Sequence, residues 1–159
     1  MSWADYQPPS AEVPLGGGAK GRVRGLNVDD LSALVTNHLE PISHAVALYA
    51  KSKKDVYSKA NLHAFVISCA SQFPGLVSEV ISLAADEPSL REKKIALSVQ
   101  IAALNEIVRL TIEELGGLGN LSLVLGNLAK GVLENQALRE PATAAGTSSP
   151  DSIGGAEKT

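Results

Sequence analysis

The sequence predicts a mainly α-helical fold: a small bundle of about five helices, preceded by a short β-hairpin and followed by a disordered tail. Two observations predict the helices and the hairpin. Apolar residues recur at i, i+3, i+4 and i+7 over much of the chain, and a glycine cluster near the N-terminus separates two short segments typical of strands. The segment Pro141–Thr159 has almost no apolar bulk. We therefore expect an extended lead and hairpin over 1–26, a helical domain over 27–138 and a disordered tail over 139–159.

The composition supports one packed domain with an aliphatic core. Of the 159 residues, 45% are hydrophobic but only 4% are aromatic, and 19% are charged. The net charge of -3 and the isoelectric point near 5.6 argue against a nucleic-acid binder that relies on a strongly basic surface. We therefore expect no nucleic-acid partner.

The single cysteine and the N-terminus suggest a reducing compartment. Cys69 lies on an apolar helical face, where a buried small side chain is the simplest interpretation. The segment Met1–Asp5 lacks the basic and then apolar pattern of a secretory signal. Since no apolar run reaches about 18 residues, we expect no transmembrane helix and no membrane partner.

The hairpin is expected from strands over Ala11–Leu15 and Gly21–Gly25, joined through Gly16-Gly17-Gly18. Its glycines also match G-x-G-x-x-G, but no helix follows as dinucleotide binding requires, so we interpret them as a flexible turn. Arg22 and Arg24 alternate with Val23 and should share one face of the strand. That face is either solvated or contacts an anionic patch on a partner.

Two short helices should follow the hairpin. Asn27 is suited to cap a helix that continues to about Asn37, with Asp29 and Asp30 in its first turn. Pro41 should then begin a second helix. The polar run Lys51–Asp55 breaks the apolar pattern and is interpreted as a solvated loop.

The central stretch, Leu62–Leu115, should contain the main packing surfaces. The pattern predicts two antiparallel helices, Leu62–Phe73 and Pro74–Ala85, with Phe65 on the buried face of the first. A capping box at Ser89 and Glu92 should start a long helix, Leu90–Leu115. One stripe of that helix is apolar and a second set of apolar residues widens it, so we expect partners on two sides. The stripe comprises Leu97, Ile101, Leu104, Val108, Ile112 and Leu115.

The last helix should begin after Gly116-Gly117, which end the preceding one. Asn120 can cap it, while Gly126 and Gly131 weaken it. Its apolar stripe comprises Leu121, Val124, Leu125, Leu128 and Val132.

Few residues in the sequence suggest catalysis or metal binding. His38, His44 and His63 do not have the spacing of a metal site and are interpreted as surface or boundary residues. H-E-x-x-H, G-x-S-x-G and C-x-x-C do not occur in the sequence. We therefore expect no catalytic, cofactor-binding or metal-binding residues, and a protein that acts by packing and association rather than as an enzyme.

Three segments resemble those of a known family. Gly25–Leu31, Phe73–Ala84 and Ser98–Ile107 look like successive pieces of the tail assembly chaperones of long-tailed bacteriophages, also called pre-tape-measure proteins. The resemblance covers roughly residues 11–133 and rests on apolar patterning and order. Family members often have a proline shortly before the valine-glutamine pair. Leu97-Ser98 stands there in this chain and favours a continuous helix from Leu90.

The resemblance implies a small helical protein that keeps the tape measure protein soluble and helps to recruit tail tube protein. It implies action in the cytoplasm of the bacterial host and absence from the mature virion. Many relatives also have a longer form made by ribosomal frameshifting. A structural tail or head-to-tail connector protein remains the alternative, and a generic helical adaptor ranks below it. Self-association stays open.

The residues expected to contact partners come from two regions. Arg22 and Arg24 could face an anionic patch, as above. Leu83 and Leu123 lie off the main stripes of their helices, so they are expected to point outward. Polar substitution of the two leucines should leave the fold intact and lose the client.

Overall fold

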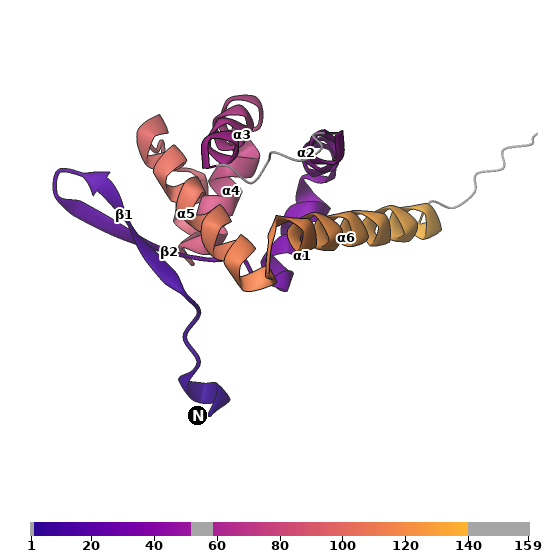
Figure 1. Cartoon of the computed structure of the whole chain (residues 1–159), viewed down its shortest axis with the longest axis horizontal. Helices are drawn as coiled ribbons and strands as arrows, with labels where there is room; N and C mark the ends of the chain where they lie inside the picture. The colour runs from indigo at the N-terminus through magenta and orange to yellow at the C-terminus, as the bar shows by residue number, and fades with distance from the viewer. Residues whose placement is uncertain (1, 52–58, 140–159) are drawn as a thin grey trace, which may run out of the picture.

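Helix α5 (Leu97–Leu115) connects the hairpin to the helices in a computed structural model that describes residues 2–51 and 59–139 (Figure 1), whereas α1 and α2 pack against α6. This helix contacts both strands of the N-terminal hairpin and three other helices. The predicted class, mainly helical with an N-terminal hairpin, is confirmed. The predicted disordered tail lies almost wholly outside the described residues.

The remaining elements follow in chain order. They are η1 (Trp3–Asp5), β1 (Ser10–Gly16), β2 (Ala19–Arg24), α1 (Val28–Asn37), α2 (Leu39–Lys51), α3 (Lys59–Gln72), α4 (Pro74–Ala84), η2 (Pro88–Arg91) and α6 (Leu118–Arg139). Here η denotes a short 3-10 helix.

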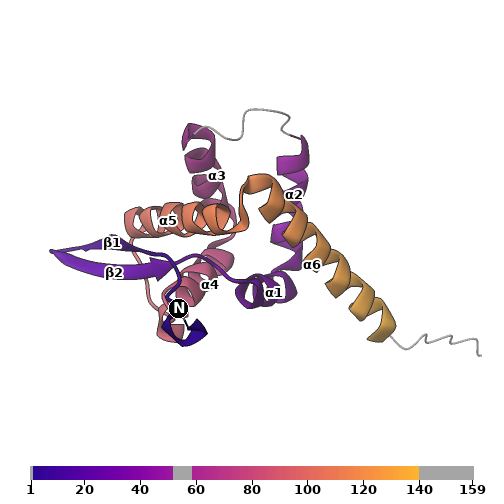
Figure 2. The same cartoon turned by 60° about the horizontal axis from the view of Figure 1, so that its bottom comes forward.

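The hairpin is an antiparallel pair that lies against α5 and extends past its N-terminal end (Figure 2). Gly16, Gly17 and Gly18 all have positive φ angles, which explains why glycines form the turn. Val13 and Val23 are buried, whereas most other hairpin side chains are exposed. The two strands therefore depend on α5 for their cover.

A close backbone approach fixes the exit of the hairpin. A Cβ at Gly25 would lie 3.2 Å from backbone atoms of Leu110 and Thr111 in α5. Next to it, the Leu26 amide donates to the Thr111 hydroxyl at 2.9 Å. Tight space, and not an unusual φ, favours glycine here.

The first helix begins as predicted. Asn27 caps α1, accepting from the Asp30 amide, and the Asp30 carboxylate accepts from the Asn27 amide in return. The next helix, α2, begins at Leu39, two residues before Pro41. Most of the predicted loop, Lys51–Asp55, lies outside the described residues.

Helices α3 and α4 do not form the predicted antiparallel pair. The chain direction changes by 115° between them, which is short of a full reversal. Pro74 is the first residue of α4. The prediction of a buried Phe65 is wrong: the residue is 37% exposed, and among the residues of α3 whose burial is described, Val66 and Ala70 are the buried ones. The packed face is turned away from Phe65.

The predicted continuous helix from Leu90 is also wrong. Residues Pro88–Arg91 form η2, and α5 begins only at Leu97, after Ala96. The Ser89 hydroxyl donates to the Glu87 carboxylate at 3.0 Å instead of capping a helix. The polar run Arg91–Lys94 has no apolar face to bury, and burial supplies most of the stability of a helix.

The end of α5 and the start of α6 show one correct and one wrong expectation. Gly116 and Gly117 have φ angles of 79° and 135°, and the Gly117 amide donates to the Ile112 carbonyl at 2.9 Å. These glycines end α5 as predicted. Asn120 does not cap α6, which begins at Leu118; its side chain donates to the Leu115 carbonyl at 2.8 Å.

The core is aliphatic, as the composition indicates, and Ile107 lies at its centre with no exposed surface. The buried face of α5 is centred on Ile107 rather than on the predicted stripe, since Leu97 is 59% exposed. The buried residues of α5 are Ala103, Leu104, Ile107, Leu110 and Thr111. Contacts with the hairpin and with other helices confirm that α5 has partners on more than one side.

Candidate partner-binding surface

The described part of the chain has no cluster of side chains suited to bind a metal ion. Across residues 2–51 and 59–139, no three His, Cys, Asp or Glu side chains gather in a way that could bind a metal ion. Within the same residues, every buried polar side-chain atom has a hydrogen-bond partner. The polar groups that do come together connect helices to one another.

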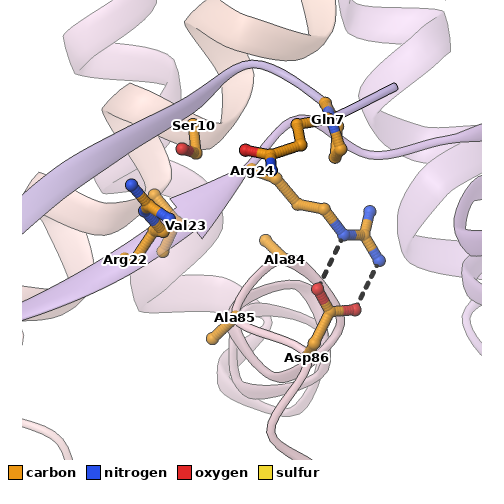
Figure 3. Close-up of a pocket in the computed structure, with 9 residues that line it drawn as sticks. Gln7, Ser10, Arg22, Val23, Arg24, Ala84, Ala85 and Asp86 are labelled. Carbon is orange, nitrogen blue, oxygen red and sulfur yellow. Dashed lines mark hydrogen bonds and ion pairs between the residues drawn. The ribbon is translucent and has the colours of Figure 1, made fainter. Parts of the chain in front are cut away.

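The main polar junction is built on Arg24, at the end of β2. Its guanidinium donates to the Asp30 carboxylate at 2.6 Å, to the Leu83 carbonyl at 3.1 Å and to the Asp86 carboxylate at 2.8 Å. Figure 3 shows the paired contact with Asp86. One side chain thus joins the hairpin to the start of α1 and to the end of α4.

The charges of this junction stabilise one another. Hydrogen bonds to Asp86 and Asp30 raise the pKa of Arg24 above its ordinary value. The hydrogen bond from Arg24 in turn lowers the pKa of Asp86. Asp86 has a φ of 54°, a left-handed conformation that costs a non-glycine residue about 1 kcal/mol. The Arg24 contact offsets that cost.

A shallow pocket of about 210 Å³ lies between the hairpin and the end of α4 (Figure 3). It is lined by Gln7, Pro8, Ser10, Arg22, Val23, Arg24, Ala84, Ala85 and Asp86. Arg22 is exposed at its edge, whereas the Arg24 side chain is only 15% exposed. The two arginines therefore differ: Arg24 serves the fold, and Arg22 is accessible to a partner.

A second polar cluster joins α4 to the C-terminal end of α1. The Glu79 carboxylate lies 2.6 Å from His38 and accepts from Asn37 at 2.9 Å. Burial acts to raise the pKa of Glu79, but hydrogen bonds from Asn37 and His38 outweigh it and lower the pKa. His38, interpreted from sequence as a surface or boundary residue, is thus half-buried in a specific contact.

Exposed leucines lie on α6, which runs away from the other helices at its C-terminal end (Figures 1 and 2). We call five residues at i, i+3, i+7, i+10 and i+14 the outer stripe, since this spacing places them on one helical face. Leu123 and Leu133 are 62% and 54% exposed, and a Cβ at Gly126 would meet nothing within 4 Å. The outer stripe comprises Leu123, Gly126, Lys130, Leu133 and Ala137.

The structure places the four predicted partner residues in different surroundings. Leu123 is exposed on the outer stripe and Arg22 is exposed on β2. Leu83, expected to point outward, is instead partly buried against the core, because α4 is covered on that side. Arg24 has the internal partners described above. Whether any of the four contacts another protein stays a prediction.

Sequence reasoning missed Leu133 as a companion of Leu123. The signal was present, because the two leucines are separated by the 3-4-3 spacing of a coiled-coil seam. It was hidden by Gly126 and Lys130, which interrupt the seam with one small and one charged residue.

In residues 2–51 and 59–139, no single helix has the length and apolar character to cross a membrane. The segments His63–Gln72 and Pro74–Ala84 have that length and apolar character only when they are taken together, and a bend of 115° separates them.

The fold and surface define a small helical protein with exposed leucines on the outer stripe of α6. The chain belongs to the pre-tape measure protein family, whose family model matches residues 1–145. This match confirms the resemblance found in the sequence and indicates a role in phage tail assembly. Searches of curated proteins and of solved structures gave no match.

Proposed function

We propose that this protein is a tail assembly chaperone that binds the tape measure protein and keeps it soluble until the tail is built. The observation that supports this proposal is the outer stripe of α6, where two leucines more than half exposed lie on one face. Family membership supplies the setting in tail assembly. The protein acts by covering apolar surface and contributes no chemistry.

The outer stripe suits a helical client. Its spacing is that of one side of a coiled coil, in which apolar residues of two helices interlock. Gly126 lets the backbone of a second helix approach closely, and Ala137 adds little bulk near the end of the stripe. Lys130 can place its stem along the client while its ammonium group remains in water.

Exposure on α6 has a reason under this proposal. Each buried leucine contributes about 1.5–3 kcal/mol, and Leu123 and Leu133 gain much of this only when a partner covers them. A long apolar client in the host cytoplasm would aggregate through the same kind of surface. Binding therefore protects both proteins until tail tube protein, recruited by this chain, replaces the chaperone. On this account the protein is absent from the mature virion.

Co-expression with a candidate tape measure protein tests the proposal. The soluble fraction of the client should rise with the wild-type chain and fall when Leu123→Asp and Leu133→Asp are combined. Asn135→Asp, which adds charge at an exposed position off the outer stripe, is the matched control. Far-UV circular dichroism should show the same helix content in all three chains.

Two results would contradict the proposal. One is a client that is equally soluble without this chain. The other is a client that stays soluble with the doubly substituted chain, which would move binding away from the outer stripe. Mass spectrometry of purified virions separates the alternative, because a structural tail or connector protein would be present in stoichiometric amounts.

A further inference from the structure

The two edges of the hairpin are not equivalent. Pro14 in β1 faces Lys20 in β2, and proline has no amide to donate across the ladder. The Pro14–Lys20 pair is therefore of the type that exchanges no hydrogen bonds, and the neighbouring Val13–Gly21 pair is of the bonded type. By alternation, the amide and carbonyl groups of Lys20 and Arg22 point away from β1, out of the open edge of β2.

The outward amide and carbonyl groups of β2 are free to form hydrogen bonds with another chain. Among residues 2–51 and 59–139, the backbone of Lys20 and Arg22 makes no hydrogen bond to any segment outside the hairpin. Both side chains are exposed, and the hairpin extends beyond the helices at this end (Figures 1 and 2). An open strand edge of this kind is a template for pairing with another chain.

The charges on β2 restrict what can pair there. Residues two apart on a strand share a face, so Lys20 and Arg22 present two positive charges side by side. Lys20 pairs with Glu12 at 2.9 Å, while Arg22 forms no ion pair within the described part of the chain. The edge therefore keeps an excess of positive charge on its exposed face.

A second copy of this chain is a poor occupant. Pairing of two β2 edges about a two-fold axis would place Lys20 and Arg22 against the same residues of the other copy, and like charges directly opposite are destabilising. Pairing through β1 would lose a donor at Pro14 and, just before the strand, at Pro8 and Pro9. The hairpin is protected against its own copies but not against an acidic strand.

We infer that the open edge of β2 binds an extended acidic segment of another protein as a third strand. Carboxylates two residues apart on that segment would face Lys20 and Arg22, and its backbone would pair with their outward groups. The approach of α4 to β2 beside Arg24, with the Asp86 carboxylate, limits the added strand to the distal half, Ala19–Arg22. This inference does not depend on binding at the outer stripe.

Amide hydrogen exchange tests the inference on the full chain. The probe is a fluorescein-labelled peptide with glutamate at alternate positions and valine or threonine between them. It should bind saturably by fluorescence anisotropy and slow exchange at the amides of Lys20 and Arg22. The amides of Val13 and Gly21, which already bond inside the hairpin, should change little. A peptide with lysine in place of glutamate should bind much more weakly.

A charge reversal and a blocked peptide separate strand addition from simple attraction. Arg22→Glu should weaken binding by about 3- to 10-fold, since it turns an attractive cross-strand pair into a repulsive one. Arg139→Glu at the C-terminal end of α6 makes the same charge change far from the hairpin in sequence and off the outer stripe, and should leave binding unchanged. The acidic peptide methylated on alternate backbone nitrogens should lose most of its affinity.

Three outcomes would overturn the inference. Equal binding of the acidic and basic peptides would remove the role of charge. Equal binding of the methylated peptide would reduce the contact to electrostatic attraction without a third strand. Unchanged exchange at Lys20 and Arg22 under saturating peptide would place the binding elsewhere on the chain.

Discussion

Helices α5 and α6 follow one another in the chain and are of similar length, 19 and 22 residues, but they are covered to different extents: α5 contacts the hairpin and three helices, whereas α6 packs against α1, α2 and α5 and leaves the outer stripe exposed. Five residues of α5 are buried, under the hairpin and three other helices. On α6, among the described side chains, only Ala129 is buried. Apolar content is similar in both, so the neighbours of a helix, and not its composition, decide whether apolar residues form core or surface.

This contrast separates stability from binding. Substitutions on α5 should act on the free energy of unfolding, because its side chains have no alternative environment. Substitutions on the outer stripe of α6 should act on partners and leave folding nearly unchanged.

The largest expected effect is at the centre of α5. Ile107→Ala should lower the free energy of unfolding by about 2–5 kcal/mol, because the side chain is fully buried and leaves a cavity. Urea denaturation followed by circular dichroism measures it. Leu123→Ala on α6 is the matched comparison and should change stability by less than about 0.5 kcal/mol. Equal losses at the two sites would show that the contrast is wrong.

A second effect on α5 comes from its contact with the chain after the hairpin. Thr111→Val keeps the shape but leaves the buried Leu26 amide without its acceptor, and should cost about 1–3 kcal/mol. Thr111→Ser, which retains the hydroxyl, should recover part of that loss. A valine variant as stable as the wild type would mean that the amide finds water instead.

Acid should loosen the α4 side of the core. The pKa of Glu79 is lower in the folded chain than its ordinary value of 4.5, so the unfolded chain binds protons first as pH falls. The stabilisation from Glu79 is complete above that ordinary value and is lost as pH falls through the lower, folded pKa. The urea midpoint should decline below about pH 4.5 in this range, and less steeply in Glu79→Gln. Parallel pH profiles for the two chains would contradict this assignment.

The smallest expected effect is an increase in the free energy of unfolding from a substitution on α6. Gly131→Ala should stabilise the helix by about 0.5–1 kcal/mol, since glycine is costly within a helix and a Cβ there meets nothing within 4 Å. Thermal unfolding measures the gain. A loss of stability would mean that Gly131 packs more closely than its open surroundings indicate.

Local signals predicted much of the fold. The glycine turn, the Asn27 cap and the paired glycines after α5 each depend on a few adjacent residues, so they could be located from sequence. The predicted capping box at Ser89 does not form, because the polar run that follows offers no face to bury. The prediction of a buried Phe65 was wrong for a related reason. Helix α3 is apolar on more than one side, and periodicity alone does not show which side is buried.

The candidate sites depended more on distant contacts. Arg24 reaches Asp86 across 62 residues, and His38 reaches Glu79 across 41. No spacing in the sequence connects such residues, which is why Arg24 was grouped with Arg22. A position off the main stripe predicted exposure correctly for Leu123 but not for Leu83, which packs against the core.

The contact between Leu26 and Thr111 has a consequence for synthesis, because 85 residues separate its two ends. At 5–20 residues per second, the ribosome takes about 4 to 17 s to make that stretch. During this interval the hairpin has been translated but α5, which covers Val13 and Val23, does not yet exist. The hairpin is therefore made well before it can reach its final packing, and the nascent hairpin is exposed to whatever else is near the ribosome.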